Sequence, residues 1–349
     1  IATKAARVVW AAGGDPIMEF GLRRAQGPDA GTYGARAAII GGCAGTSNVL
    51  TGKMFGVPIL GTHAHSWVMS FPSEIEAFRH YAKTFPDACT FLVDTYDTLR
   101  SGVPNAIKVF QEMKDAGIEL KNYGIRLDSG DLAYLSKKAR KMLDEAGFTD
   151  AKITASSDLD EYLIMSLKLQ GAKINNWGVG TKLITSDDCP SFGGVYKLAA
   201  ESDENGNFIP KIKLSNNPSK VTNPGIKKVL RFYDKATGKI KADLICLDDE
   251  VYSEDKKVKL FDHTAVWKKM VLHPGEYSIR ELLVPVFING ECVYNSPCVT
   301  DIRAYCQKEL NTLWDEHRRL ANPHNVPVDL SDKLLDLKNK LIEEMSEEE

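Results

Sequence analysis

Two histidines lie one residue apart in the segment GTHAHSWVMS, residues 61–70, which follows the apolar run VPIL. At the end of a β-strand, alternate residues point to the same side, so His63 and His65 could bind one metal ion together. One of them could instead act as a nucleophile toward phosphorus, with a carboxylate that fixes its tautomer. Asp94, which ends the next apolar run, is well placed to be that carboxylate.

A metal site would need more ligands than these two. Paired histidines of this kind bind zinc in barrel amidohydrolases, but only together with further histidines, an aspartate and often a lysine. None of the other histidines follows a strand of the expected sheet; they are His80, His263, His273, His317 and His324. The seven cysteines form no CxxC pair, and the spacing of Cys292, Cys298 and Cys306 fits no common zinc pattern. The sequence predicts free thiols in a reducing compartment and no tight metal site.

The elements that must position these residues alternate between about residues 55 and 200. Short apolar runs typical of strands are separated by segments of helical periodicity, such as 74–85 and 131–147. The expected strands are 57–62, 90–95, 123–128, 152–157 and 175–180. This order predicts parallel βα units, in which ligands bind at the carboxyl ends of the strands.

Polar residues or glycines follow each of the five expected strands. In strand order they are Thr62, His63 and His65; Asp94; Arg126, Asp128, Ser129 and Asp131; Ser156, Ser157 and Asp158; and Gly178, Gly180 and Thr181. Any one of these residues alone is typical of a helix N-cap. Five such sets at one edge of a sheet favour a binding site there.

Several of these groups suit phosphates and sugars. The glycine turns GVGT (178–181) and FGG (192–194) could bind a phosphate through free backbone N–H groups. Arg126 suits a carboxylate or a phosphate, and Asp128 suits a ribose hydroxyl or a magnesium-bound diphosphate. The pair Arg23–Arg24 is either another anion-binding site or an ordinary basic surface pair.

The pattern changes from about residue 193. Strand-like runs separated by Asn, Gly, Pro and Asp turns predict a mostly antiparallel second lobe, and helical character returns over 301–320. We therefore expect an α/β catalytic domain over 1–192 and a second domain over 193–349. The prediction leaves open a return of part of the C-terminal helices to the first domain.

Composition narrows the class of protein. The 349 residues are 43% hydrophobic and 26% charged, which is typical of a globular protein. The formal net charge of −3 provides no basic field for nucleic acid. No apolar run reaches the length of a membrane span, and the chain opens on no basic-then-apolar leader. The sequence predicts a cytoplasmic protein with neither a nucleic acid nor a membrane as partner.

Long blocks of this sequence resemble the nicotinate phosphoribosyltransferase family, in its bacterial ATP-coupled form. The blocks are EFGLRRAQGPDAG (19–31), GGCAGTSNVLTGKMFGVP (41–58), GTHAHSWVMSF (61–71), DTYDTLRSGVPNA (94–106), GIRLDSGDLAYL (124–135), ASSDLDE (155–161) and NWGVGTKLITS (176–186). Further blocks extend the resemblance to residue 331, so that it covers nearly the whole chain.

The resemblance implies a fold and a reaction. The fold is an irregular TIM-like α/β barrel with a mostly antiparallel sandwich lobe, in a homodimer. The reaction joins nicotinate to 5-phosphoribosyl 1-diphosphate and gives nicotinate mononucleotide and diphosphate, a step of NAD biosynthesis. Mg²⁺ is the implied cofactor, and ATP is a co-substrate that is hydrolysed through a phosphohistidine. The resemblance also implies a further stretch before Ile1, with an aromatic residue that closes over the pyridine ring across the dimer.

The resemblance also implies roles for individual residues. His65 matches the phosphohistidine and Asp94 the carboxylate that orients it, which leaves His63 without a catalytic role. The implied contacts to nicotinate are Arg23, Ser47, Thr62 and Arg126. The implied contacts to the phosphoribosyl donor are Asp128, Ser157, Gly178, Gly180, Thr181, Gly193 and Gly194.

Ser47 carries the implied choice of substrate. It stands where the related nicotinamide enzyme has an aspartate that accepts a hydrogen bond from the amide. Without that carboxylate, the anionic acid should be favoured over the amide, because two carboxylates repel each other.

Two other interpretations remain open from the sequence. A zinc amidohydrolase would use His63 and His65 as ligands, and a barrel without catalytic activity would act as a subunit or a sensor. Within the phosphoribosyltransferases, nicotinamide and quinolinate are the alternative substrates. Ser47 disfavours the first, and the histidine of AHS with its ATP coupling disfavours the second.

Overall fold

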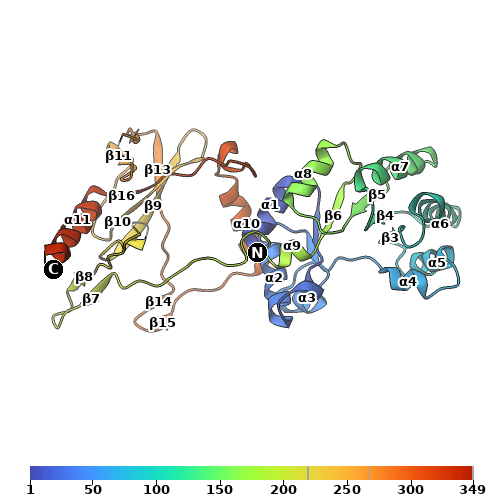
Figure 1. Cartoon of the computed structure of the whole chain (residues 1–349), viewed down its shortest axis with the longest axis horizontal. Coiled ribbons are helices and arrows are strands. Elements are labelled where there is room, and N and C mark those ends of the chain that lie inside the picture. The colour runs from blue at the N-terminus through green and yellow to red at the C-terminus, as the bar shows by residue number, and fades with distance from the viewer. Residues whose placement is uncertain (218–219, 266, 348–349) are drawn as a thin grey trace. The chain divides into compact units, whose positions relative to one another are not determined.

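The structure is a computed structural model that describes residues 1–217, 220–265 and 267–347. The chain forms two compact units, shown in Figure 1. The first unit comprises Ile1–Phe192 together with Pro297–Gln307, and the second comprises Gly193–Ser296 together with the chain from Lys308 onward. Residues 297–307, near the C-terminus, therefore belong to the unit that carries the N-terminus.

A six-stranded parallel sheet forms the centre of the first unit. Its spatial order is β2-β1-β6-β5-β4-β3, which leaves β2 and β3 at the edges of an open half-barrel. The strands are β1 (Ile17–Glu19), β2 (Gly45–Thr46), β3 (Cys89–Leu92), β4 (Tyr123–Leu127), β5 (Lys152–Ala155) and β6 (Asn176–Val179). The predicted α/β class and the parallel βα order are confirmed.

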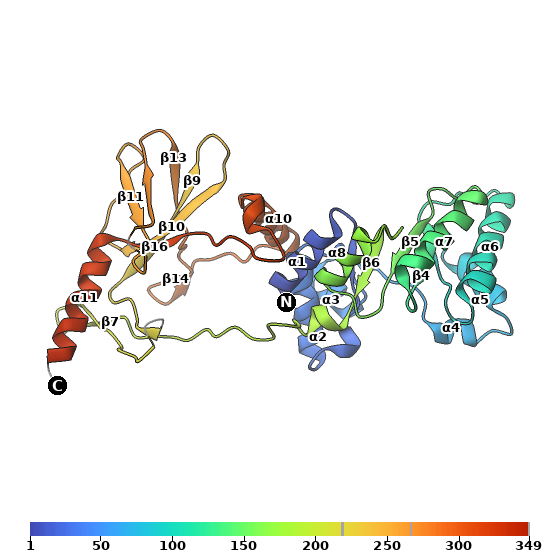
Figure 2. The same cartoon turned by 45° about the horizontal axis from the view of Figure 1, so that its top comes forward.

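Helices connect these strands. They are α1 (Ala2–Ala12), η1 (Leu22–Arg24), α2 (Pro28–Ile40), α3 (Val49–Phe55), α4 (His65–Met69), α5 (Glu74–Thr84), η2 (Thr98–Gly102), α6 (Val103–Asp115), α7 (Leu132–Glu145), α8 (Glu161–Leu169), α9 (Thr181–Ile184) and α10 (Val299–Leu310). Figures 1 and 2 both show α5, α6 and α7 beside β4 and β5, and Figure 1 labels β3 next to them. None of the described helices combines the length and the hydrophobicity needed to cross a membrane.

Two details of the sheet differ from the sequence prediction. Segment 57–62 was expected to be a strand, but it forms only an isolated bridge between Ile59 and Thr46. The strand that occupies this edge of the sheet is instead β2, which has two residues, beside β1, which has three. Both strands are too short to show the alternation of polar and apolar residues by which a strand is recognised.

Aromatic stacking forms much of the core of the first unit. Phe91 lies on β3, fully buried, with ring centroids 4.6 Å from Phe78 of α5 and 5.0 Å from Phe110 of α6. Phe110 in turn meets Tyr123 of β4 edge-on at 5.0 Å. These rings fix α5 and α6 against the strand whose end carries Asp94.

The second unit is built mainly from antiparallel strands. They are β7 (Ala200–Ser202), β8 (Phe208–Pro210), β9 (Lys227–Asp234), β10 (Ile240–Leu247), β11 (Val258–Phe261), β12 (Lys269–Leu272), β13 (Tyr277–Glu281), β14 (Phe287–Ile288), β15 (Glu291–Cys292) and β16 (Val328–Leu330), followed by α11 (Asp332–Glu347). The short helix η4 (Asp315–His317) precedes β16. The largest sheet has the order β13-β9-β10-β16, in which only β10 and β16 pair in parallel. Phe232 and Tyr277 are fully buried in its core.

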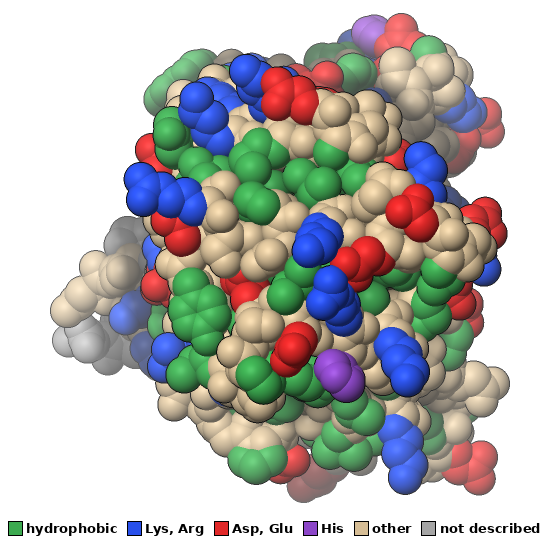
Figure 3. Space-filling view, turned by 90° about the vertical axis from the view of Figure 1, so that its right-hand side faces the viewer, with side chains coloured by type: hydrophobic (Ala, Val, Ile, Leu, Met, Phe, Trp, Pro, Cys, Tyr) green, Lys and Arg blue, Asp and Glu red, His purple; other side chains and the backbone are tan. Residues whose placement is uncertain are grey.

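Charged side chains of both signs lie interspersed over the face of the molecule that Figure 3 presents. The view shows no continuous basic surface on this face, in keeping with the small net charge of −3.

We predict that Phe91→Ala lowers the free energy of unfolding of the first unit by about 3–5 kcal/mol, because it removes a ring packed between two others. Denaturant unfolding, monitored by the near-ultraviolet signal of the aromatic residues, measures this change. The matched control is Leu169→Ala, at a side chain that is 82% exposed, which should shift stability by less than about 0.5 kcal/mol. Equal effects of the two substitutions would contradict the proposed packing.

Candidate functional site

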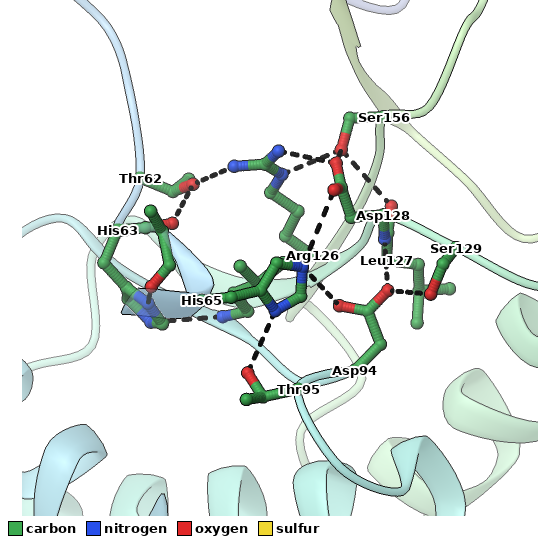
Figure 4. Close-up of polar contacts among 12 residues, drawn as sticks. Thr62, His63, His65, Asp94, Thr95, Arg126, Leu127, Asp128, Ser129 and Ser156 are labelled. Carbon is green, nitrogen blue, oxygen red and sulfur yellow. Dashed lines mark hydrogen bonds and ion pairs between the residues drawn. The ribbon is translucent and has the colours of Figure 1, made fainter. Parts of the chain in front are cut away.

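Some of the polar residues expected at one edge of the sheet contact one another there. Figure 4 shows His65, at the start of α4, facing Asp94 and Thr95, which follow β3, and Asp128, which follows β4. Because the strands are parallel, their carboxyl ends lie at the same edge of the sheet, and the residues that follow them come together there.

The imidazole of His65 has a different environment at each nitrogen. Its Nδ1 lies 3.1 Å from Oγ1 of Thr95, which is hydrogen-bonding distance. Its Nε2 faces two carboxylates, with Oδ2 of Asp128 at 3.6 Å and Oδ1 of Asp94 at 3.9 Å. The side chain is 38% exposed, so the ring is anchored on one side and open to a substrate on another.

Asp94 lies at ion-pair distance from His65, but its hydrogen bonds go to other groups. Its side chain is 3% exposed, and its Oδ2 accepts hydrogen bonds from the backbone N–H of Asp128 at 2.8 Å and from Ser129 Oγ at 2.7 Å. Its Oδ1 has no hydrogen-bond partner in the described part of the chain. The 3.9 Å separation from His65 is an ion-pair distance, so the hydrogen bond that fixes the ring comes from Thr95 instead.

Arg126 is the second centre of the site. Its guanidinium donates to Ser156 Oγ at 2.8 Å, to Thr62 Oγ1 at 2.9 Å and to Asp128 Oδ1 at 2.6 Å. A guanidinium has five N–H groups, so two remain for a ligand. The ring of Phe20 lies 5.4 Å from the guanidinium carbon and covers one of its faces. Arg126 is thus held in a fixed orientation, with donors left that suit an anionic group.

Asp128 is kept ionised by these neighbours. Burial raises the pKa of its carboxyl group, but the hydrogen bond from Ser156 and the charge of Arg126 outweigh burial and lower the pKa overall. The carboxylate that faces His65 Nε2 therefore carries a negative charge at neutral pH.

His63 has a structural environment. It is 7% exposed and packs against the rings of Tyr81 and Phe78, with centroids at 4.7 and 6.0 Å. Its Nε2 accepts a hydrogen bond from the backbone N–H of Leu92 at 3.1 Å, and its Nδ1 lies 3.4 Å from the carbonyl oxygen of Ala64. Neither nitrogen is free for a metal ion.

The turn after β5 is strained. Ser157 and Asp158 have φ angles of 107° and 40°, a region that residues other than glycine seldom adopt. Such strain often occurs at binding sites, and here it presents Ser157 at the same edge as Arg126.

The two predicted glycine turns occupy different settings. Gly178 lies within β6, where an added Cβ would come within 2.6 Å of the Phe20 ring, and Gly180 directly precedes the four-residue helix α9 that starts at Thr181. Gly193 and Gly194 are exposed residues at the start of the second unit. A phosphate-binding role for any of these four glycines or for Thr181 stays a prediction.

The loops after β1 and β2 carry the remaining expected residues. Arg23 is exposed on η1, and Ser47 is half-buried just after β2, with its backbone N–H donating to the carbonyl oxygen of Glu19 at 3.0 Å. Both residues follow strands of the parallel sheet, and their contacts to a substrate stay predictions.

Sequence reasoning missed two side chains of the site, Thr95 and Phe20, and named Ser156 after the fourth expected strand without giving it a role. Thr95 and Ser156 are hydroxyl residues after strands, which are usually read as helix caps. Phe20 follows the short strand β1, which was not predicted. The one signal that could have identified Thr95 was its position next to Asp94 at the end of an expected strand.

Comparisons with known proteins agree on one family. A family model described as "Nicotinate phosphoribosyltransferase (NAPRTase) family" matches residues 16–191, and one described as "Nicotinate phosphoribosyltransferase C-terminal domain" matches residues 226–338. A Bacillus subtilis protein named nicotinate phosphoribosyltransferase is 50% identical over 358 residues, which span 100% of this chain and 71% of that protein. A Dictyostelium discoideum protein of the same name is 37% identical over 98% of this chain and 65% of its own length.

A solved structure gives the same result. The crystal structure of human nicotinic acid phosphoribosyltransferase superposes with a TM-score of 0.77 and 28% sequence identity, over 98% of this chain and 73% of that one. The chain thus spans roughly two thirds to three quarters of the length of these relatives.

We predict that His63 makes stability fall on mild acidification. Burial, with smaller effects of Arg126 and His65, lowers its pKa to about 4, against 6.5 for a free histidine. Because the unfolded chain then binds the proton more readily than the folded one, this stabilisation is present above about pH 6.5 and is lost as the pH falls toward 4. Urea unfolding gives the free energy of unfolding at pH 7 and at pH 5. Its decrease between these pH values should be about 2 kcal/mol larger in the unsubstituted protein than in His63→Gln. An identical pH dependence of both proteins would show that His63 is not a buried neutral ring.

Proposed function

Because the chain belongs to the nicotinate phosphoribosyltransferase family, we propose that it joins nicotinate to 5-phosphoribosyl 1-diphosphate, giving nicotinate mononucleotide and diphosphate. ATP hydrolysis drives the reaction through a phosphoryl group carried by His65. The observation that supports this proposal best is the half-exposed imidazole of His65, hydrogen-bonded at one nitrogen and faced by two carboxylates at the other.

The carboxylates decide which nitrogen reacts. Asp94 and Asp128 both face Nε2 and favour a proton there, which leaves the lone pair on Nδ1, beside Thr95. Nδ1 gives up its hydrogen bond with Thr95 and attacks the γ-phosphorus of ATP, the bond from that phosphorus to the bridging oxygen breaks, and ADP leaves. The two carboxylates balance the positive charge of the ring. Water later attacks the same phosphorus, the N–P bond breaks, and phosphate is released.

Arg126 orients nicotinate. Its two remaining N–H groups are directed by the bonds to Ser156, Thr62 and Asp128, and they suit the carboxylate of the pyridine. The pyridine nitrogen then attacks the anomeric carbon of the ribose as the bond to diphosphate breaks. In this transition state the bond to the charged diphosphate is breaking. It is stabilised mainly by the positioning of the reactants and by groups that stabilise the charge of the leaving diphosphate.

The phosphoribosyl donor occupies the neighbouring part of the edge in this proposal. Asp128 and Ser157 contact the ribose, while Gly178, Gly180 and Thr181 line the phosphates. Arg23 and Ser47 lie beside the pyridine.

The residues present fit Mg²⁺. Among the described residues, Oδ1 of Asp94 is buried without a hydrogen-bond partner, and Oδ2 of Asp128 also faces Nε2 of His65. Both are the hard oxygen ligands that this ion prefers. The described residues form no cluster of three or more metal-ligating side chains, which suits an ion that takes its other ligands from substrate phosphates and water. When bound, Mg²⁺ would neutralise charge on the diphosphate.

A zinc amidohydrolase is disfavoured, because both nitrogens of His63 are occupied by backbone groups. The homodimer and the cytoplasmic location belong to the proposal as family properties.

We predict that His65→Ala abolishes transfer of the labelled γ-phosphate of ATP to the protein, while a slow formation of nicotinate mononucleotide without ATP remains. Acid-labile, base-stable ³²P on the protein and product formation, assayed with nicotinate, donor and Mg²⁺, measure the two effects. The matched control is His80→Ala, an exposed histidine on α5, which should keep full labelling. Undiminished label on the His65→Ala protein would refute the assignment.

We predict that Ser47→Asp raises the KM for nicotinate by about tenfold or more, because a second carboxylate beside that of the substrate costs on the order of 1–2 kcal/mol. Steady-state kinetics with nicotinate and with nicotinamide measure the change in preference. Ser47→Asn, which has the same shape without the charge, is the control. If Asp and Asn act alike at this position, size and not charge selects the substrate.

A further inference from the structure

Glu19 is a buried acid that the mechanism above does not use. It ends β1, and its side chain is fully buried. Alternate residues of a strand point to opposite faces, and the preceding Met18 lines a cavity of about 230 Å³ together with Thr62. The carboxylate of Glu19 therefore lies on the opposite, helix-covered face of the sheet, behind the site.

We infer that Glu19 is a positioning residue that ties together the two loops proposed to contact nicotinate. The inference rests on the proposed function and extends it to a residue that does not touch the substrate.

The contacts of Glu19 join exactly two loop ends. Its Oε1 accepts a hydrogen bond from the backbone N–H of Gly21, the residue that opens the turn carrying Arg23. Its Oε2 accepts from Oγ1 of Thr46 at 2.5 Å, one residue before Ser47. Its own carbonyl oxygen accepts from the backbone N–H of Ser47 at 3.0 Å. One carboxylate thus sets the start of both loops.

Thr46 connects Glu19 to two further segments of the chain. Its Oγ1 also accepts from the backbone N–H of Asn48 at 2.9 Å, and its carbonyl oxygen accepts from the N–H of Leu60 at 2.9 Å. Leu60 lies two residues before Thr62, which bonds Arg126. A shift of Thr46 therefore reaches the Ser47 loop and the segment that carries Thr62.

The electrostatic environment of Glu19 supports a role as the acceptor of these hydrogen bonds. Burial raises the pKa of Glu19, and the hydrogen bonds from Thr46 and Gly21 lower it only in part. Within residues 1–217, 220–265 and 267–347, no cation forms an ion pair with Glu19. A buried carboxylate without a cation is costly, and an apolar residue at this strand position would serve packing at less cost.

The hydrogen bond between Gly21 and Glu19 requires a residue without a side chain at position 21. An added Cβ would lie 2.4 Å from Cβ of Ile184 and 2.8 Å from Oε1 of Glu19. Only glycine lets the backbone come close enough for its N–H to meet the carboxylate while α9 packs on the other side.

The test separates positioning from general stability with a pair of variants at Thr46. Thr46→Val keeps the shape and removes the hydroxyl, whereas Thr46→Ser keeps the hydroxyl and serves as the matched control. We expect Thr46→Val to raise the KM for nicotinate about tenfold and to change the KM for 5-phosphoribosyl 1-diphosphate by less than about twofold, with Thr46→Ser close to the unsubstituted protein. Glu19→Ala should have the same selective effect, and Glu19→Gln, which keeps one acceptor oxygen, should recover part of it.

Five outcomes are informative. A rise confined to the nicotinate KM, reversed in Thr46→Ser, supports the inference. Equal rises of both KM values that follow a fall in Tm would overturn it in favour of a purely structural role, as would an unchanged nicotinate KM in Thr46→Val. If Glu19→Ala does not fold, the two Thr46 variants decide the question alone. Absence of nicotinate mononucleotide with the unsubstituted protein would overturn the proposed function itself, and this inference with it.

Discussion

The site depends on the hydrogen bonds and the ion pair of the Asp128 carboxylate. One of its oxygens receives hydrogen bonds from Arg126 and Ser156, and the other faces Nε2 of His65. Its backbone N–H in turn holds Asp94 in place. A single side chain at the end of β4 thereby links the guanidinium of Arg126 to the imidazole of His65. The lowered pKa of Asp128 keeps this link ionised, so the orientation of both partners is maintained at neutral pH.

The parallel sheet makes this convergence possible. Three neighbouring strands, β3, β4 and β5, end beside one another and deliver Asp94, Asp128 and Ser156. The stacked rings of Phe78, Phe91 and Phe110 hold the helices that flank β3. Because the core fixes the strand ends, the polar groups stay oriented although the edge of the sheet is open to solvent.

Much of this arrangement could be predicted from the sequence, and the reasons for the exceptions are physical. Helix α7 was predictable because Asp131 caps it and Gly147 follows its end. Strands β1 and β2 were not, since three and two residues show no period. Only family resemblance separated the two histidines, and the different environments of His63 and His65 were not predictable. Their cause is the packing of His63 against α5, a contact between segments that local sequence does not encode.

The contact between Gly178 and Phe20 also has a consequence for the evolution of this edge of the sheet. The ring of Phe20 covers Arg126 on one face and fills the space above Gly178, where a methyl group would collide with it. A larger residue at 178 is therefore compatible only with a smaller one at 20, and that exchange would uncover the guanidinium. The two positions should therefore co-vary among homologous sequences, as pairs in direct contact do.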